Sequence, residues 1–100
     1  MRSIRFALLA LVTATATLHA ADVNNGKRLY NLHCAGCHGM SGISVMPGAP
    51  HIARGAGVMQ PDAATLASIR NGKNAMPAYM GVIKDQEILD VIAYMRTLRK

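Results

Sequence analysis

The chain has 100 residues and a formal net charge of +6, from 11 Lys and Arg against 5 Asp and Glu, and 51% of its residues are hydrophobic. This length excludes a multi-domain enzyme, and the apolar fraction argues against intrinsic disorder. No uncharged apolar run reaches the roughly 20 residues that a membrane-spanning helix needs, so the sequence argues against stable membrane insertion.

Residues 1–20 have the pattern of a secretory signal peptide. The start is positively charged, a short apolar stretch follows at residues 6–12, and the small Ala20 occupies the expected cleavage position. An uncleaved membrane anchor is the alternative, but the apolar stretch is short and polar threonines follow it. We therefore expect export to the periplasm and removal of this segment.

The mature chain, residues 21–100, is expected to form one domain. Loss of Arg2 and Arg5 leaves nine basic against five acidic residues, a formal charge of +4. Without a long basic run, this charge indicates no nucleic-acid partner, but it favours encounter with an acidic protein surface. With three Tyr and no Trp the core is thin. Chains this small usually add a disulfide, a metal or a cofactor to the core.

The first predicted helix covers residues 22–32, and Asp22 or Asn24 can cap its start. Gly26 stands inside this helix, where a glycine costs about 1 kcal/mol relative to alanine. We therefore expect a close approach of another part of the backbone at Gly26. Residues 36–57 then form a glycine-rich loop, which is long for so small a domain unless something fills it.

Two further helices are predicted in the C-terminal half, and no strand pattern is present. One covers residues 61–71, with Pro61 in its first turn and Gly72 as its stop. The last covers residues 86–98, with Asp85 as its N-cap. Its apolar face repeats at helical spacing and consists of Ile88, Val91, Ile92, Met95 and Leu98. The sequence therefore predicts an all-α domain.

Cys34, Cys37 and His38 form the motif Cys-x-x-Cys-His, which is typical of covalent haem attachment. The two thiols can add to the two vinyl groups of one haem, and the adjacent imidazole then reaches the iron as proximal ligand. The spacing matters because the thioether bonds fix one porphyrin edge, from which the imidazole must reach the centre. We predict one covalent haem c with its iron, which also supplies the core that the chain lacks.

Three other uses of this motif fit the sequence less well. A disulfide leaves His38 without a role, and a thioredoxin-like redox pair needs a strand–helix context that is absent here. A zinc site would combine Cys34 and Cys37 with His33 and His38. All four ligands would then lie within six residues, a poor arrangement for a tetrahedral site.

An electron-transfer haem needs a sixth iron ligand, and Met76 is the best candidate. A methionine thioether is a soft ligand that raises the reduction potential. Met76 lies in the loop before the last helix, and Pro77 stiffens the chain beside it. Met80 is the main rival in the same loop. The remaining candidates are less suitable by position: Met59, Met40, Met46, Met95, His33 and His51.

Residues 24–98 resemble the small soluble mono-haem class I cytochromes c of bacteria. The resemblance rests on four segments: Gly26–Tyr30, Cys34–His38, Gly72–Tyr79 and Val91–Met95. It implies an all-α cytochrome c fold, in which three to four short helices wrap around one covalently bound haem. It also implies that the first and last helices cross at Gly26, with Tyr94 close to this glycine and Tyr30 packed nearby.

The resemblance further implies that a proline carbonyl accepts a hydrogen bond from the proximal histidine and fixes its tautomer. Pro50 matches that residue, and Pro47 is the competing candidate. Relatives often have Ser or Thr before the last helix, where this chain has Lys84. The capping role is therefore expected to fall to Asp85.

Motif and resemblance together predict a one-electron carrier and not an enzyme. We expect electrons to pass through an exposed haem edge near Cys37, during brief contacts between a monomer and its protein redox partners. Four basic residues are candidates to ring that edge: Lys27, Arg54, Lys73 and Lys84. One alternative is a five-coordinate haem enzyme or gas-binding protein. Another is an accessory cytochrome that assists assembly of a larger haem enzyme.

Overall fold

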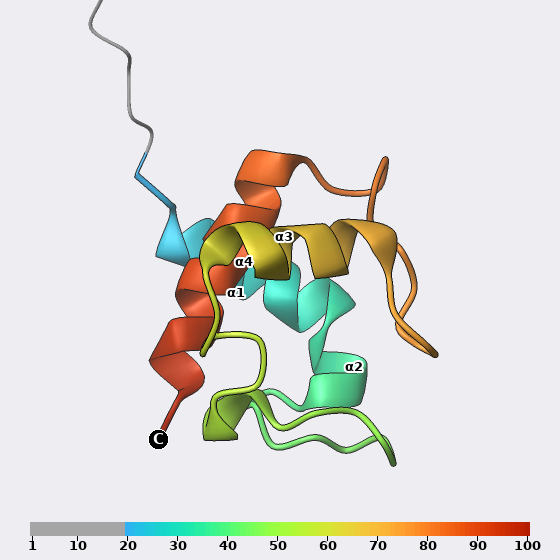
Figure 1. Cartoon of the computed structure of the whole chain (residues 1–100). Coiled ribbons are helices and arrows are strands. Elements are labelled where there is room, and N and C mark those ends of the chain that lie inside the picture. The colour runs from blue at the N-terminus through green and yellow to red at the C-terminus, as the bar shows by residue number, and fades with distance from the viewer. Residues whose placement is uncertain (1–19) are drawn as a thin grey trace, which may run out of the picture.

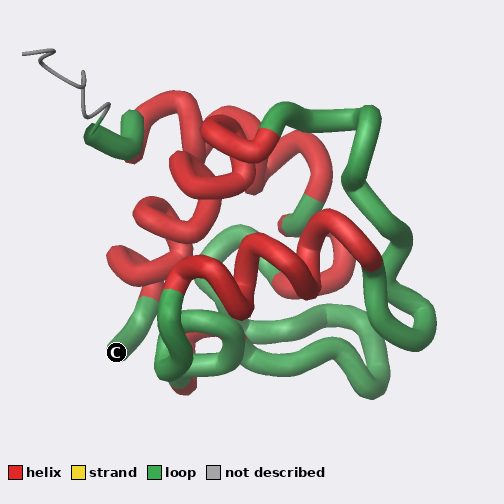
Figure 2. The backbone as a smooth tube through the Cα atoms, turned by 45° about the horizontal axis from the view of Figure 1, so that its top comes forward, coloured by secondary structure: helices red, strands yellow, loops and turns green. Residues whose placement is uncertain are grey.

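The computed structural model describes residues 20–100, and within that range the secondary structure is entirely helical (Figures 1 and 2). The elements in chain order are α1 (Val23–His33), α2 (Ala35–His38), a short 3-10 helix (Ile52–Arg54), α3 (Asp62–Asn71) and α4 (Asp85–Leu98). The prediction of an all-α domain is confirmed. The predicted signal peptide lies outside the described residues, except for Ala20. Among the described helices, none is long and apolar enough to cross a membrane.

Of the two predicted caps of α1, the structure uses Asp22. Its carboxylate accepts a hydrogen bond from the backbone N–H of Asn25 at 3.0 Å, as expected of an N-cap. The helix ends at Cys34, whose N–H donates to the carbonyl of Tyr30 at 2.8 Å. The helix therefore delivers the chain directly to the first cysteine of the motif.

Helix α1 passes across α4, and Gly26 is the contact point (Figure 1). A Cβ atom on Gly26 would lie 2.0 Å from the carbonyl oxygen of Asp90, so only glycine fits. The backbone of α4 at Asp90 and Val91 comes nearest to Gly26, so the close approach of another backbone segment is confirmed. Tyr94 packs on Tyr30, with ring centroids 5.3 Å apart in an edge-to-face arrangement.

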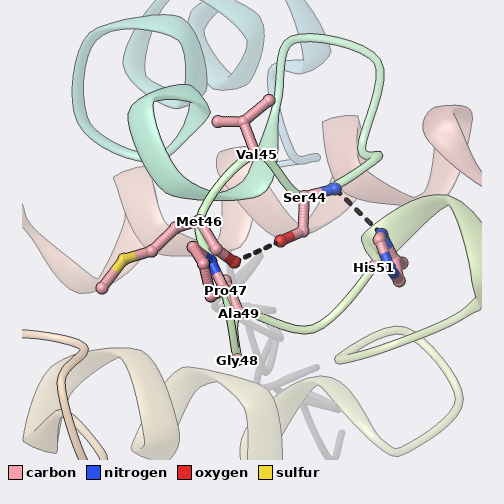
Figure 3. A pocket seen from close by; sticks show the side chains of 7 residues that line it. All are labelled: Ser44, Val45, Met46, Pro47, Gly48, Ala49 and His51. Atoms are coloured by element: carbon pink, nitrogen blue, oxygen red, sulfur yellow. Dashed lines mark hydrogen bonds between the residues drawn. The ribbon is translucent and has the colours of Figure 1, made fainter.

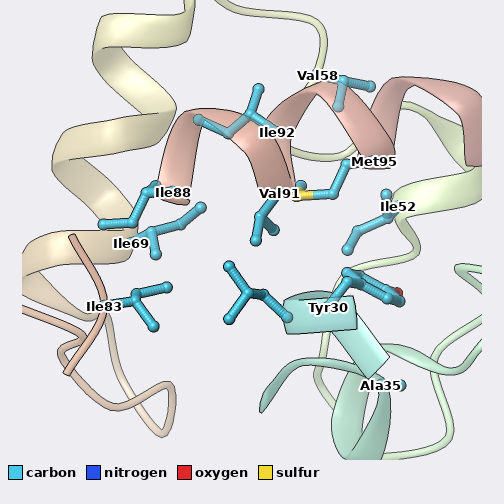
Figure 4. Packing of buried hydrophobic residues seen from close by; sticks show 11 residues of the cluster. Tyr30, Ala35, Ile52, Val58, Ile69, Ile83, Ile88, Val91, Ile92 and Met95 are labelled. Atoms are coloured by element: carbon cyan, nitrogen blue, oxygen red, sulfur yellow. The ribbon is translucent and has the colours of Figure 1, made fainter. Parts of the chain in front are cut away.

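The core lies between α4, α1 and α3 (Figure 4). Four of the five residues predicted for the apolar face of α4 are buried, and Leu98 is partly buried. Burial of such a side chain contributes roughly 1.5–3 kcal/mol, so α4 is a main source of stability. The other buried side chains that pack on this face include Leu29, Tyr30, Ile52, Val58, Ile69 and Ile83.

The predicted starts of α3 and α4 each require a correction of one residue. Pro61 precedes α3 as its N-cap and is not in its first turn. Asp85 is the first residue of α4 and not its cap, which is Lys84. The reason is local, because the carboxylate of Glu87 accepts the free N–H of Lys84 at 3.3 Å. Asp85 forms an exposed ion pair with Arg70 of α3 at 3.2 Å instead.

Candidate haem site

The two cysteines lie on one helical turn that continues from α1. Cys34 ends α1 and precedes α2, and its carbonyl accepts hydrogen bonds from the N–H groups of Cys37 and His38 at 3.2 and 3.0 Å. Both thiols are free. Cys34 is partly buried against the core, whereas Cys37 is exposed. One thiol therefore faces the interior and the other the surface, both close to His38 in sequence.

Burial raises the pKa of the Cys34 thiol to about 11, and the neighbouring Cys37 adds to this effect. A reactive redox cysteine has a lowered pKa instead. This environment therefore disfavours the thioredoxin-like alternative. Within residues 20–100, no group of three or more His, Cys, Asp or Glu side chains is arranged to hold a metal ion.

The imidazole of His38 is held by the backbone of the following loop. Its Nδ1 lies 3.0 Å from the carbonyl oxygen of Pro50. A carbonyl can only accept, so Nδ1 carries the proton and Nε2 is left as the nitrogen with a free lone pair. It is the carbonyl of Pro50, and not that of Pro47, that makes this contact.

The segment after His38 is fixed from inside the core by Tyr30. Its hydroxyl donates to the carbonyl of Gly39 at 2.7 Å, and this hydrogen bond is buried. Burial raises the pKa of Tyr30 to about 12, with smaller effects of Cys34 and Tyr94. The resemblance implied that Tyr30 packs near the helix crossing but did not reveal this bond, because its acceptor is a backbone group nine residues away.

The three loop methionines that compete for the role of iron ligand differ in exposure. Met76 is partly buried and packs against the core, whereas Met80 and Met59 are 60% and 66% exposed. Reciprocal backbone hydrogen bonds between Lys73 and Met76, at 3.1 and 2.9 Å, form a tight turn that fixes Met76. Met80 lies beyond this turn, and its sulfur accepts from the guanidinium of Arg70 at 3.6 Å.

Tyr79 joins the Met76 turn to the cysteine motif. Its hydroxyl donates to the carbonyl of His33 at 2.9 Å, and the two rings lie edge to face with centroids 5.7 Å apart. Burial raises the pKa of Tyr79, and the nearby Cys34 and Cys37 raise it further. This long-range contact was missed at the sequence level, although Tyr79 belongs to the segment Gly72–Tyr79 that carries the resemblance.

The donors assembled here fit a haem c. Two free thiols next to one imidazole would hold the haem, and the free Nε2 of His38 and the thioether of Met76 are the candidate iron ligands. The other residues considered as iron ligands lie in environments that suit this role less well. Met95 is buried in the core, Met40 is 68% exposed, and the ring of His51 accepts a loop hydrogen bond. The predicted basic residues Lys27, Arg54, Lys73 and Lys84 are all exposed.

Comparison with known proteins places these observations in a family context. Residues 21–95 match the family model described as "Cytochrome C oxidase, cbb3-type, subunit III". Cytochrome c6 of Thermosynechococcus vestitus is 37% identical over 93 residues, which cover 89% of this chain and 81% of that protein. A cytochrome c6-like protein of Nostoc sp. is 34% identical over 97 residues, which cover 88% and 81%. The structure of cytochrome c6 from the diatom Phaeodactylum tricornutum superimposes with a TM-score of 0.65 at 30% identity, covering 77% of this chain and 93% of that one.

Proposed function

Since the chain belongs to the class I mono-haem cytochromes c and is related to cytochrome c6, we propose that it is a one-electron carrier of the periplasm with His/Met ligation. Cytochrome c6 proteins are electron carriers and not enzymes, and the family implies covalent haem c. The proposal goes further in assigning the residues, the compartment and the partners.

Five residues are assigned to the haem. Cys34 and Cys37 would hold it through two thioether bonds, and His38 Nε2 and the sulfur of Met76 would ligate its iron. A haem held in this way would supply an iron that can take up and release one electron. The carbonyl of Pro50 keeps the proton of His38 on Nδ1 and orients the ring.

The surrounding residues hold these ligands in place. The turn between Lys73 and Met76 fixes the methionine, and the bond from Tyr79 to His33 ties that turn to the cysteine motif. Buried side chains of α1, α3 and α4 exclude water from the interior. A rigid ligand set changes little between oxidation states, which is what an electron carrier requires.

The observation that carries the proposal is the hydrogen bond between His38 Nδ1 and Pro50 at 3.0 Å, next to two free thiols. It leaves Nε2 as the nitrogen able to bind iron, on the residue that follows the attachment cysteines. A disulfide or a thiol-based redox site has no need of this arrangement.

The proposal includes export and a docking edge. Residues 1–20 are removed as a signal peptide, and residues 21–100 act as a monomer that meets protein redox partners near the exposed Cys37. The exposed basic residues favour partners with acidic surfaces. Neither nucleic acid nor stable membrane insertion has a part in this function.

Intact mass spectrometry of the protein expressed with its own leader tests attachment and export together. The expected mass is that of residues 21–100 plus one haem, retained after denaturation because thioether bonds are covalent. The variant Cys34→Ser with Cys37→Ser is expected to lose the haem mass. A mature wild-type chain without added haem would overturn the proposal, and a retained leader would overturn the assignment of residues 1–20.

A further inference from the structure

The loop between α2 and the 3-10 helix is anchored to the cysteine motif at two separate points. Near its start, the N–H groups of Val45 and Met46 both donate to the carbonyl of Cys37, at 3.0 and 3.2 Å. Near its end, the carbonyl of Pro50 accepts from His38 Nδ1 at 3.0 Å. One loop thus holds two adjacent residues of the motif.

His51 joins the two anchored stretches directly (Figure 3). The backbone N–H of Ser44 donates to His51 Nδ1 at 2.9 Å. Because this nitrogen accepts, the ring is neutral and its proton is on Nε2. Hydrogen bonds and peptide bonds therefore form a closed circuit from Cys37 through Ser44, His51 and Pro50 back to His38.

Backbone bonds also hold the ends of this loop, from the Ala53 N–H to the Gly42 carbonyl at 3.0 Å and from the Arg54 N–H to the His51 carbonyl at 3.1 Å. The middle of the loop has less support. Residues 46–48 are exposed, and Gly48 has a φ of +85° with no neighbour within 4 Å of a Cβ position. A backbone bond from Ala49 to Met46 at 3.1 Å closes one turn. A hollow of about 330 Å³ lies beside it, lined by Ser44, Val45, Met46, Pro47, Gly48, Ala49 and His51, none of which is acidic or a permanent cation. The imidazole is thus the main side-chain link between the two anchors.

We propose that His51 is a positioning residue for the proximal histidine, because its imidazole holds Pro50 in place and so keeps the Pro50 carbonyl on His38 Nδ1. This inference rests on the haem site proposed above. A carbonyl on the second ring nitrogen increases the basicity of a ligating imidazole, and a more basic ligand favours oxidised iron. A variant of His51 that cannot accept the Ser44 N–H is therefore expected to have a higher reduction potential.

The experiment compares the purified holo-proteins of the wild type, His51→Leu and His51→Asn by spectroelectrochemical titration at pH 8. In His51→Leu the equilibrium constant for reduction is expected to rise about three- to tenfold, where tenfold corresponds to ~59 mV for one electron. In His51→Asn, Oδ1 can accept the Ser44 N–H, and the constant is expected to stay within about twofold of the wild type. Hydrogen exchange of the Ser44 amide should be faster only in His51→Leu.

Ser44→Ala is the matched control. It removes the hydroxyl that donates to the Met46 carbonyl at 2.8 Å but keeps the backbone N–H that reaches His51. Its potential should equal that of the wild type. If His51→Leu does not assemble with haem, His51→Phe serves in its place, because its ring resembles imidazole in shape but has no nitrogen to accept the Ser44 N–H.

Two results would overturn the role of His51 while the haem site stands. One is equal potentials in the wild type and His51→Leu, and the other is an equal rise in His51→Leu and Ser44→Ala, which indicates general loosening of the loop. A wild-type protein without covalent haem contradicts the proposed function itself, so the two failures are distinguishable.

Discussion

Met76 and Met80 are four residues apart in one loop, yet their environments are different. Met76 packs against the core within a turn closed by its own backbone, whereas Met80 is 60% exposed with its sulfur beside the guanidinium of Arg70. Sequence alone favoured Met76 from its position and from Pro77, but it could not measure burial. The environments of the two side chains support the same choice.

Met76→Ala is expected to abolish the Met–iron absorption band of the oxidised protein and to lower the reduction potential, because a soft thioether ligand stabilises reduced iron. Met80→Ala is the control, and it should leave both properties nearly unchanged. Absorption spectra and redox titrations of the two variants measure these effects. Equal loss in both, or loss in Met80→Ala alone, would reverse the assignment.

The buried phenol of Tyr30 makes the free energy of unfolding depend on pH in the alkaline range. Burial raises its pKa to about 12 from the ordinary 10, so the folded state keeps the phenol proton in a range where the unfolded state loses it. The contribution of this phenol to the free energy of unfolding is complete below pH 10 and is lost as the pH rises toward 12. At pH 11 the free energy of unfolding is lower by about 1 kcal/mol.

Tyr30→Phe removes this titration together with the hydrogen bond to Gly39, which costs about 1 kcal/mol at every pH. Its free energy of unfolding should therefore start lower at pH 8 but decline less between pH 8 and pH 11 than that of the wild type. Denaturant unfolding at the two pH values measures the difference. Parallel declines in both proteins would contradict the role given to Tyr30.

At the scale of elements, the crossing of α1 and α4 decides the architecture. Their backbones meet at Gly26 and Asp90, and the buried carboxylate of Asp90 accepts from the Asp22 N–H at 2.8 Å and from the Asn25 amide at 3.0 Å. The glycine was predictable as a close contact because it stands inside a helix. Its partner was not, since Asp90 is an acidic residue in an otherwise apolar stretch and the contact spans more than 60 residues.

Gly26→Ala is expected to destabilise the protein by about 3 kcal/mol, because its Cβ would lie 2.0 Å from the Asp90 carbonyl and must force the helices apart. Gly36→Ala, in α2, is the matched control, since nothing lies within 4 Å of its Cβ position. That variant should be neutral or more stable by up to about 1 kcal/mol. Thermal unfolding of both proteins measures the contrast, and a tolerated Gly26→Ala would contradict the crossing.

For the whole molecule, local patterns gave α1, α3 and α4 to within one residue at each end, because helical spacing and capping depend on neighbouring residues. The short α2 and the 3-10 helix fall largely within residues 36–57, which were expected to form a loop, because helices of so few residues carry no periodic pattern. Contacts such as Tyr79 with His33, or Ser44 with His51, depend on how the loops fold over the core. No local pattern contains that information. The attachment motif was predictable because its three residues are contiguous, whereas the Pro50 contact needed a resemblance to suggest it.

Removal of both attachment cysteines tests whether the haem is part of the core. Cys34→Ala with Cys37→Ala is expected to yield a chain without cooperative thermal unfolding, because so small a domain buries little apolar surface without a cofactor. Far-ultraviolet circular dichroism on heating is the measurement. A sharp transition close to the wild-type temperature would contradict this role of the haem.

The central claim is a single haem bound through Cys34 and Cys37 with His38 and Met76 as iron ligands, which carries one electron at a time. A redox titration of the purified exported protein, followed by its visible absorption spectrum, tests this most directly. The account predicts one reversible one-electron transition, a low-spin spectrum in both states and a Met–iron band in the oxidised state. High-spin features without that band, or a folded colourless protein, would contradict it.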